Sequence, residues 1–341
     1  MLQVKNATPF AVSLMPLPDA HGVDTVFTVV KGTFSIGQSI ALADEQVPVA
    51  AVDAHYGEPA ETSVRVPSDM CLGKPGTDVL LHGSAWAPGG RPAWQTDVSI
   101  AVGGLAQGVR VFGDRVWDAG PAGAAITYVA PFERMPLVWE RAFGGADQTE
   151  RGPAIDPRNP VGRGFRAPDG ARPLNGLPLP NLEHPAKPIS SWRDAPPPAC
   201  LAPVAAHWEP RRSYAGTYDE AWRKNRAPYL PTDFDARFFQ LAPAGLVANG
   251  YLQGGELVDI RGVTPNGALQ FVLPALRINV TYRLDRGIET RPTVLDTVII
   301  EPDAARLVMV WRAALSCDKR TLKVREVEPA LEAAGRGAYA A

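Results

Sequence analysis

The sequence DTVFTVVKGTFSI, at Asp24–Ile36, decides the fold class of this chain. β-branched and aromatic side chains fill it, and such side chains favour a pleated and mostly buried strand. Gly32 lies inside this strand and indicates a bulge or a bend there. We therefore expect a long strand near the start of a β-rich region.

Similar β-type sequence patterns recur in the first and the last parts of the chain. Short apolar segments separated by turn residues predict several strands in a sandwich or an open antiparallel sheet. The predicted strands are 79–85, 96–102 and 109–117 in the first part, and 256–262, 268–273, 275–284, 294–301 and 306–313 in the last part. Within 109–117, Gly113-Asp114 separates VRVF from RVW, and this two-residue spacer predicts a tight hairpin.

The segment 141–235 between these strands has a different composition. It contains sixteen of the 34 prolines, all of them within 151–231, together with Trp192, Trp208 and Trp222. Proline at this density forbids a continuous helix or a central strand, because it lacks the N–H donor and fixes φ. A disordered segment would have few aromatic residues. We expect an ordered irregular segment, and long loops of this kind tend to be functional.

One short helix is predicted inside this segment. Thr217 and Glu220 have the spacing of a capping box, and Tyr218 and Trp222 lie four residues apart on one face. Pro228 ends the helix. We expect Thr217, Glu220 and Trp222 to anchor the segment to the core through Trp222. A second helical piece, 133–143, is interrupted by its Met-Pro pair at 135–136.

These patterns predict a mainly β protein. Two β-rich regions, 1–140 and 236–327, are joined by the ordered segment 141–235, which is rich in Pro, Gly and aromatic residues and carries one or two short helices. The Ala- and Gly-rich tail 328–341 is expected to be flexible. The alternative is that all of these regions form a single continuous domain.

Composition restricts the classes of partner. The formal charge is -2 and the pI is about 6.2, and no local run of Lys or Arg favours nucleic acid. No stretch is long and apolar enough for a membrane helix, and residues 1–10 show no signal peptide. Three widely spaced cysteines fit reduced thiols. We expect a cytoplasmic protein without nucleic-acid or membrane partners.

No catalytic or metal-binding motif is visible in the sequence. The five histidines lie far apart, the cysteines form no C-x-x-C pair, and there is no nucleophile elbow, phosphate loop or dinucleotide fingerprint. We therefore expect no metal, no cofactor and no enzymatic activity.

Two pairs of carboxylates keep an alternative open. Glu133 with Glu140, or Asp233 with Asp235, could serve as acid and base in a carbohydrate-active enzyme acting on cell-wall glycan. The more ordinary interpretation is that Asp233 and Asp235 cap a turn and that the glutamates form structural ion pairs.

A family resemblance rests on motifs that occur in order along nearly the whole chain. The main ones are PFERMPLVWERAFGG (131–145), NPVGRGF (159–165), LPNLEHP (179–185) and AGTYDEAWRKNRAPYLPTDFD (215–235). Supporting motifs are LGKPGTDVLLHG (72–83), FGDRVW (112–117) and DTVIIEPDAARLVMVWR (296–312). With these motifs the chain resembles the DUF2169 family.

The resemblance implies a bacterial accessory protein of type VI secretion. Members of that family are described as adaptors or chaperones that hold a secreted effector, often by its PAAR-like or other N-terminal part, and assist its loading onto the VgrG spike. The resemblance supplies no catalytic residues. A third alternative is a purely structural component of the secretion machine.

The motifs of the central segment are the expected protein-binding site, since aromatic residues and arginines supply most of the binding energy at interfaces. The same residues could instead fix turns that cover the sheet. The candidate protein-binding residues are Arg141, Phe143, Gly144, Gly145, Asn159, Gly162, Arg163, Phe165, Asn181 and Glu183.

Overall fold

Strand β3 (Asp24–Ile36) lies inside the largest sheet of the computed structural model, which describes residues 2–121, 123–318 and 321–332. Residues 25–34 are all buried, because neighbouring strands and packed side chains cover β3 on every side. The sheet has the order β2-β3-β24-β23-β7, with β4 pairing the end of β3. Its other members are β2 (Ala11–Pro18), β24 (Arg306–Ser316), β23 (Val294–Glu301), β7 (Asp78–Leu81) and β4 (Ile40–Leu42).

Gly32 forms no bulge, contrary to the prediction. The register between β3 and β24 is continuous, with Gly32 opposite Met309. A Cβ atom at position 32 would lie 3.0 Å from the ring of Phe10 and 3.1 Å from the ring of Trp311. These two rings stack with their centroids 5.7 Å apart. The glycine therefore makes room for aromatic packing and does not mark a bulge.

A second, antiparallel sheet combines strands from all three regions of the chain. Its order is β18-β10-β9-β19-β20, and its strands are β18 (Leu182–Glu183), β10 (Leu105–Phe112), β9 (Gln95–Val102), β19 (Leu257–Arg261) and β20 (Leu269–Val272). Residues of this sheet and of the largest sheet belong to one buried hydrophobic cluster, so the two sheets share a core.

The hairpin predicted at Gly113-Asp114 is wrong. Strand β10 ends at Phe112 and pairs with β9, whereas β11 (Trp117–Gly120) pairs with β12 (Gly123–Ile126). The tight turn lies at Gly103-Gly104, between β9 and β10, where Gly103 has a φ of +56°. Glycine adopts this left-handed conformation without the steric cost that a Cβ atom brings.

A smaller sheet brings the two ends of the described chain together. Its order is β1-β25-β21-β22, with β1 (Gln3–Val4), β25 (Val324–Leu331), β21 (Ile278–Leu284) and β22 (Ile288–Pro292). Residues 328–331 belong to β25, which corrects the predicted start of a flexible tail at 328. The rest of that tail, 333–341, lies outside the described residues.

The mainly β fold class is confirmed: several sheets are present, and the described residues contain one α-helix beside short 3-10 turns. The regions 1–140 and 236–327 do not build separate sheets, because the largest sheet places β3 next to β24 and β7 next to β23. Strands from the two regions therefore pair within one sheet, where β24 and β23 lie between β3 and β7.

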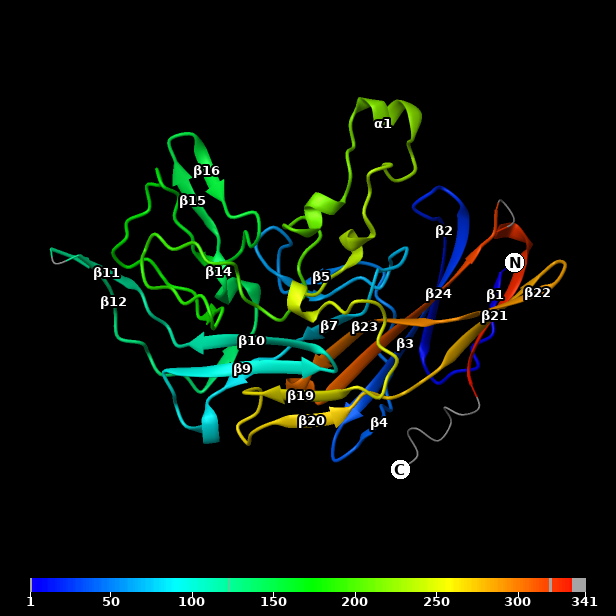
Figure 1. Cartoon of the computed structure of the whole chain (residues 1–341), viewed down its shortest axis with the longest axis horizontal. Helices are drawn as coiled ribbons and strands as arrows, with labels where there is room; N and C mark the ends of the chain where they lie inside the picture. Colours follow the sequence, from blue (N-terminus) through cyan, green and yellow to red (C-terminus); the bar gives the residue numbers. More distant parts are fainter. Residues whose placement is uncertain (1, 122, 319–320, 333–341) are drawn as a thin grey trace.

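The central segment contains only short elements, as its proline content predicts. Figure 1 shows two parts of it: a lobe that carries β14 to β16, and an excursion, residues 215–235, that carries α1 at its tip. The short strands here and nearby are β13 (Arg134–Pro136) with β8 (Ser84–Trp86), β14 (Phe143–Gly144) with β17 (Arg163–Gly164), β15 (Ala146–Thr149) with β16 (Gly152–Ile155), and β5 (Ala54–His55) with β6 (Val64–Val66).

The helical piece predicted at 133–143 is also wrong. Pro136 belongs to the short strand β13, and only Trp139–Arg141 form a single 3-10 turn, η2. The remaining 3-10 turns are η1 (Pro88–Gly90), η3 (Arg211–Tyr214), η4 (Ala236–Phe239), η5 (Ala244–Leu246), η6 (Pro302–Ala304) and η7 (Thr321–Lys323).

Helix α1 (Glu220–Asn225) begins later than predicted, so the capping box is wrong. Its N-cap is Asp219, whose carboxylate accepts a hydrogen bond of 2.7 Å from the backbone N–H of Trp222. Thr217 is held elsewhere, because its backbone N–H and its hydroxyl both donate to the carboxylate of Asp233. The predicted contact of Tyr218 with Trp222 is confirmed, with ring centroids 4.7 Å apart.

The predicted anchor of the central segment is wrong as well. No residue of α1 is buried, and the indole N–H of Trp222 donates to the carbonyl of Tyr229 within the same excursion. Trp208 fills the core instead: it is fully buried, and its ring packs against that of Trp139 at 6.0 Å between centroids. The segment is therefore attached to the core at Trp208, whereas the indole hydrogen bond of Trp222 stays within the excursion.

Candidate functional site

The glycine-rich motifs of the central segment come together around Asn159. Its carbonyl accepts hydrogen bonds from the N–H groups of Gly145 (2.8 Å) and Gly162 (3.2 Å). Its fully buried amide nitrogen donates to the carbonyls of Trp139 (2.8 Å) and Phe143 (2.9 Å). One side chain thus joins motifs that lie about twenty positions apart in the sequence.

The glycines at this junction are required by close backbone contact. A Cβ atom at Gly144 would lie 2.2 Å from the carbonyl oxygen of Asn159, and one at Gly145 would lie 2.5 Å from that of Gly162. Both glycines also have positive φ, at +144° and +103°. These positions exclude every other residue type without a backbone shift.

A cluster of polar side chains lies next to this junction. The guanidinium groups of Arg141 and Arg163 both donate to the side-chain oxygen of Asn181, at 3.1 and 3.2 Å. Arg141 also pairs with Asp114 at 3.2 Å. Burial and the nearby charge of Arg141 lower the pKa of Arg163. The two arginines are about 30% exposed at their side chains, so this cluster reaches the surface.

Glu183 occupies a different environment from the exposed arginines. Its buried carboxylate pairs with the guanidinium of Arg115 and accepts a hydrogen bond of 3.0 Å from the N–H of Ile189. Arg115 also donates to the carbonyl of Pro180 and lies over the ring of Phe112. This ion pair fixes the chain around β18.

The candidate protein-binding residues therefore divide by exposure. Half-buried residues that can meet a partner directly are Arg141, Gly162, Arg163 and Phe165, whereas buried residues are Phe143, Gly144, Gly145, Asn159, Asn181 and Glu183. A buried side chain contacts a partner only if the segment opens. The hydrogen bonds of the buried group give it a structural role in the closed segment.

Three of the four carboxylates considered for catalysis, Glu140, Asp233 and Asp235, are engaged in local contacts. Glu140 accepts hydrogen bonds of 2.8 Å from both the N–H and the hydroxyl of Ser63. Asp235 caps η4 through the N–H of Arg237, as predicted, and Asp233 holds Thr217. These hydrogen bonds lower the pKa of Asp233 and of Asp235. A general acid needs the opposite shift, a raised pKa.

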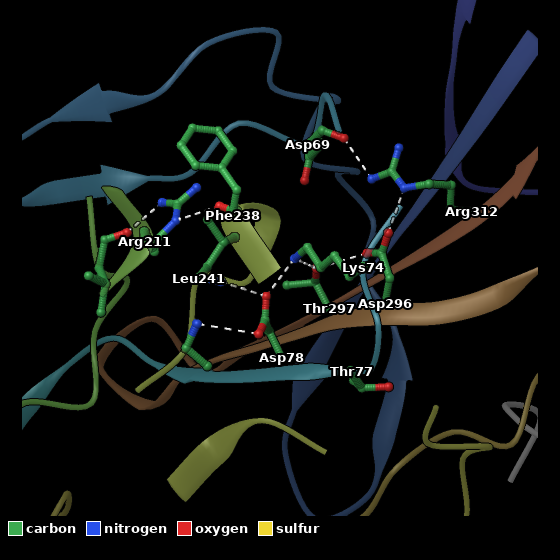
Figure 2. Close-up of polar contacts among 12 residues, drawn as sticks. Asp69, Lys74, Thr77, Asp78, Arg211, Phe238, Leu241, Asp296, Thr297 and Arg312 are labelled. Atoms are coloured by element: carbon green, nitrogen blue, oxygen red, sulfur yellow. Dashed lines mark hydrogen bonds and ion pairs between the residues drawn. The ribbon is translucent and has the colours of Figure 1, made fainter. Parts of the chain in front are cut away.

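A buried network of charges, which was not predicted from the sequence, crosses the largest sheet (Figure 2). The ammonium group of Lys74 contacts Asp78 at 2.7 Å and the hydroxyl of Thr297 at 2.6 Å. Thr297 donates to Asp296, which pairs with Arg312 at 2.6 Å. Burial alone would lower the pKa of Lys74, but the charges of Asp78 and Asp296 raise it, so the ammonium group stays protonated.

The network extends to a third ion pair and is neutral overall. Arg312 donates to the backbone carbonyl of Asp69, whose carboxylate pairs with Lys31 at 2.8 Å. The three basic residues Lys31, Lys74 and Arg312 thus balance the three acidic residues Asp69, Asp78 and Asp296. Such a network specifies how strands join, since a wrong pairing would leave a buried charge without a partner.

A sequence signal for this network existed. Asp78, Asp296 and Arg312 are charged residues inside or beside apolar strand segments, where an unpaired charge would be costly. The sequence alone did not show which of these charges would meet, because their partners lie up to 243 positions apart.

An apolar groove of about 800 Å³ lies where the central segment meets η5. Prolines form much of its wall, and Trp139 and Tyr214 supply aromatic surface. The lining residues are Trp139, Arg158, Pro197, Pro198, Val204, Glu209, Pro210, Arg211, Tyr214, Arg237, Gln240, Ala242, Pro243, Ala244, Val247, Ala248 and Asn249. A concave, mostly apolar surface with a few polar groups is the usual form of a binding site.

A family model described as an uncharacterized protein conserved in bacteria, DUF2169, matches residues 21–312. The chain belongs to the DUF2169 family. The match covers all strands of the central segment and most of the largest sheet. No curated protein and no solved structure matches this DUF2169 chain.

Within residues 2–121, 123–318 and 321–332, no three His, Cys, Asp or Glu side chains gather in a way that could hold a metal ion. Over the same ranges, no helix has the length and apolar character needed to cross a bilayer.

Proposed function

We propose that this DUF2169 protein is a non-catalytic adaptor that binds a type VI secretion effector, by its PAAR-like or other N-terminal part, and assists its loading onto the VgrG spike. The secretion context comes from the family resemblance of the motifs. The adaptor role is supported by one observation above all, the apolar groove beside the central segment. The proposed place of action is the cytoplasm.

The groove supports protein binding because its walls are held rigidly. Trp139 donates its indole N–H to the carbonyls of Ala202 and Pro203, and Trp208 packs against it from the core. A surface that is already ordered loses little conformational entropy when a partner binds. The half-buried arginines Arg141 and Arg163 offer a second, polar contact area.

Co-expression with the effector encoded beside the gene tests the proposal. We expect the effector to co-purify with the wild-type chain and to be lost with Ala244→Trp, which fills the groove from an exposed position. The matched control is Ala60→Trp, an equally large change at an exposed position outside the groove. Retention of the effector by Ala244→Trp would place the binding surface elsewhere.

Two further measurements separate the alternatives. A structural component would remain in assembled secretion machines, whereas an adaptor is released after loading. A carbohydrate-active enzyme would turn over cell-wall glycans and lose this activity in Glu140→Gln. Failure of any neighbouring effector to co-purify with the wild-type chain would overturn the adaptor proposal.

A further inference from the structure

Arg211 carries a buried charge on the wall of the groove without an acidic partner. Its side chain lies on η3, and the residue is only 7% exposed. Its guanidinium donates to two neutral acceptors, the carbonyl of Phe238 at 2.9 Å and the carbonyl of Val204 at 2.6 Å (Figure 2). Among the described residues, no carboxylate forms an ion pair with it.

The other arginines of the groove differ from Arg211 in this respect. Arg158 pairs with Asp156 at 2.6 Å, and Arg237 pairs with Asp235 at 2.6 Å. Glu209, the acidic residue of the lining, accepts a hydrogen bond from Ser213. The groove therefore has one guanidinium whose charge is balanced by no adjacent carboxylate.

Burial makes this charge costly. Desolvation lowers the pKa of Arg211, and only more distant acidic groups such as Asp53 and Asp78 oppose that effect. A buried charge normally has a partner of opposite sign. A carboxylate that entered the groove would restore this balance, and an arginine can hold it through two parallel hydrogen bonds.

We propose that the groove binds an extended apolar segment of the partner protein that places one carboxylate against Arg211. The carboxylate is an Asp or Glu side chain or a free C-terminus. This inference rests on the proposed function for the identity of the partner as the effector. It adds the chemistry of the segment that the effector presents.

The lining favours an extended segment over a helix or a polar ligand. Grooves lined by aromatic residues recognise extended, proline-containing chains, because such chains are already close to their bound conformation. Pro197, Pro198, Pro210 and Pro243 supply no N–H donors, so these parts of the wall offer apolar contact, and Arg211 adds the buried cation.

A displayed library of random dodecapeptides, selected on the full chain, provides the probe. We expect enriched peptides to share an acidic group between apolar residues, and to lose binding to Ala244→Trp but not to Ala60→Trp. Resynthesis of a selected peptide with Asn or Gln in place of its acidic residue, or with an amidated C-terminus, should weaken binding about tenfold or more. This change leaves the protein, and hence its folding, untouched.

Variants of the protein complete the test. Arg211→Met should weaken the acidic peptide about tenfold or more but leave its neutral analogue unchanged, while Arg211→Lys should retain part of the preference. If no peptide is enriched that Ala244→Trp excludes, or if acidic and neutral peptides bind equally well, the inference is overturned.

The outcomes also separate this inference from the proposed function. An effector that co-purifies with both Ala244→Trp and Arg211→Met would leave the adaptor role standing and remove the groove as its site. Acidic peptides that bind the groove while no effector co-purifies would retain the inference about the groove and remove the proposed partner.

Discussion

The ammonium group of Lys74 lies 2.7 Å from the carboxylate of Asp78, and both side chains are buried. Asp78 also accepts hydrogen bonds from the N–H groups of Leu241 and Ala242. The carboxylate therefore joins the loop before β7 to the segment that follows η4. The hydrogen bond from Leu241 to Asp78 connects parts of the chain that are more than 150 positions apart. The strand β7, which begins at Asp78, also pairs with β23.

Removal of the cation from this pair should be strongly destabilising. In Lys74→Met the buried charge of Asp78 loses its ionic partner, and we expect a loss of about 3–5 kcal/mol in the free energy of unfolding. Chemical denaturation measures this loss. Lys187→Met, at an exposed position, is the matched control and should change stability by less than about 0.5 kcal/mol. Equal effects of the two substitutions would refute the structural role of the pair.

Gly144 and Gly152 provide a test of close backbone contact. Both have positive φ, but a Cβ atom at Gly144 would collide with the carbonyl of Asn159, whereas one at Gly152 would meet nothing within 4 Å. Gly152→Ala should cost about 1–2 kcal/mol from its backbone conformation alone. Gly144→Ala should cost about 1–3 kcal/mol more, because overpacking is added. Thermal unfolding of both variants measures the difference, and equal losses would contradict the junction at Asn159.

His82 predicts a dependence of stability on pH. Burial lowers its pKa from 6.5 to about 4, and its ring nitrogen Nε2 has no hydrogen-bond partner among the described residues. Between these two pKa values the unfolded chain binds a proton that the folded chain does not. The stability should therefore fall as the pH drops from about 6.5 to about 4, by about 1.4 kcal/mol per pH unit.

The control for this pH dependence is a second histidine. Burial also lowers the pKa of His207, which is exposed overall, so His207→Gln should leave most of the slope in place. His82→Gln should remove most of it. Denaturant titrations at several pH values measure both slopes, and an unchanged slope in His82→Gln would show that another group titrates.

Local patterns were sufficient to predict much of the fold. β-branched and apolar runs identified β3, β9 and β23 nearly to the residue, because β3 and β23 are mostly buried and β9 alternates buried with more exposed side chains. The order of strands within the sheets was not predictable, since β3 pairs with β24 and β7 with β23 across hundreds of residues. Long-range pairing depends on packing that no local window contains.

The candidate site was predictable only in part. The motifs containing Gly144 and Gly162 were singled out, but their role as a buried junction depends on Asn159, which brings them together. The groove around Arg211 was missed, because its walls come from separate segments between Trp139 and Asn249. Trp222 was assigned to the core from helical spacing, yet such spacing identifies a shared face and not what that face contacts.

The contrast between two tryptophans tests how the central segment is attached. Trp208 is fully buried against Trp139, so Trp208→Ala should cost about 3–5 kcal/mol in global stability. Trp222 is half-buried and contacts Tyr218 and the carbonyl of Tyr229, so Trp222→Ala should cost about 1–2 kcal/mol. Limited proteolysis should then show cleavage confined to the α1 excursion in Trp222→Ala and spread over the whole segment in Trp208→Ala. A larger global loss from Trp222→Ala would restore Trp222 as the anchor to the core.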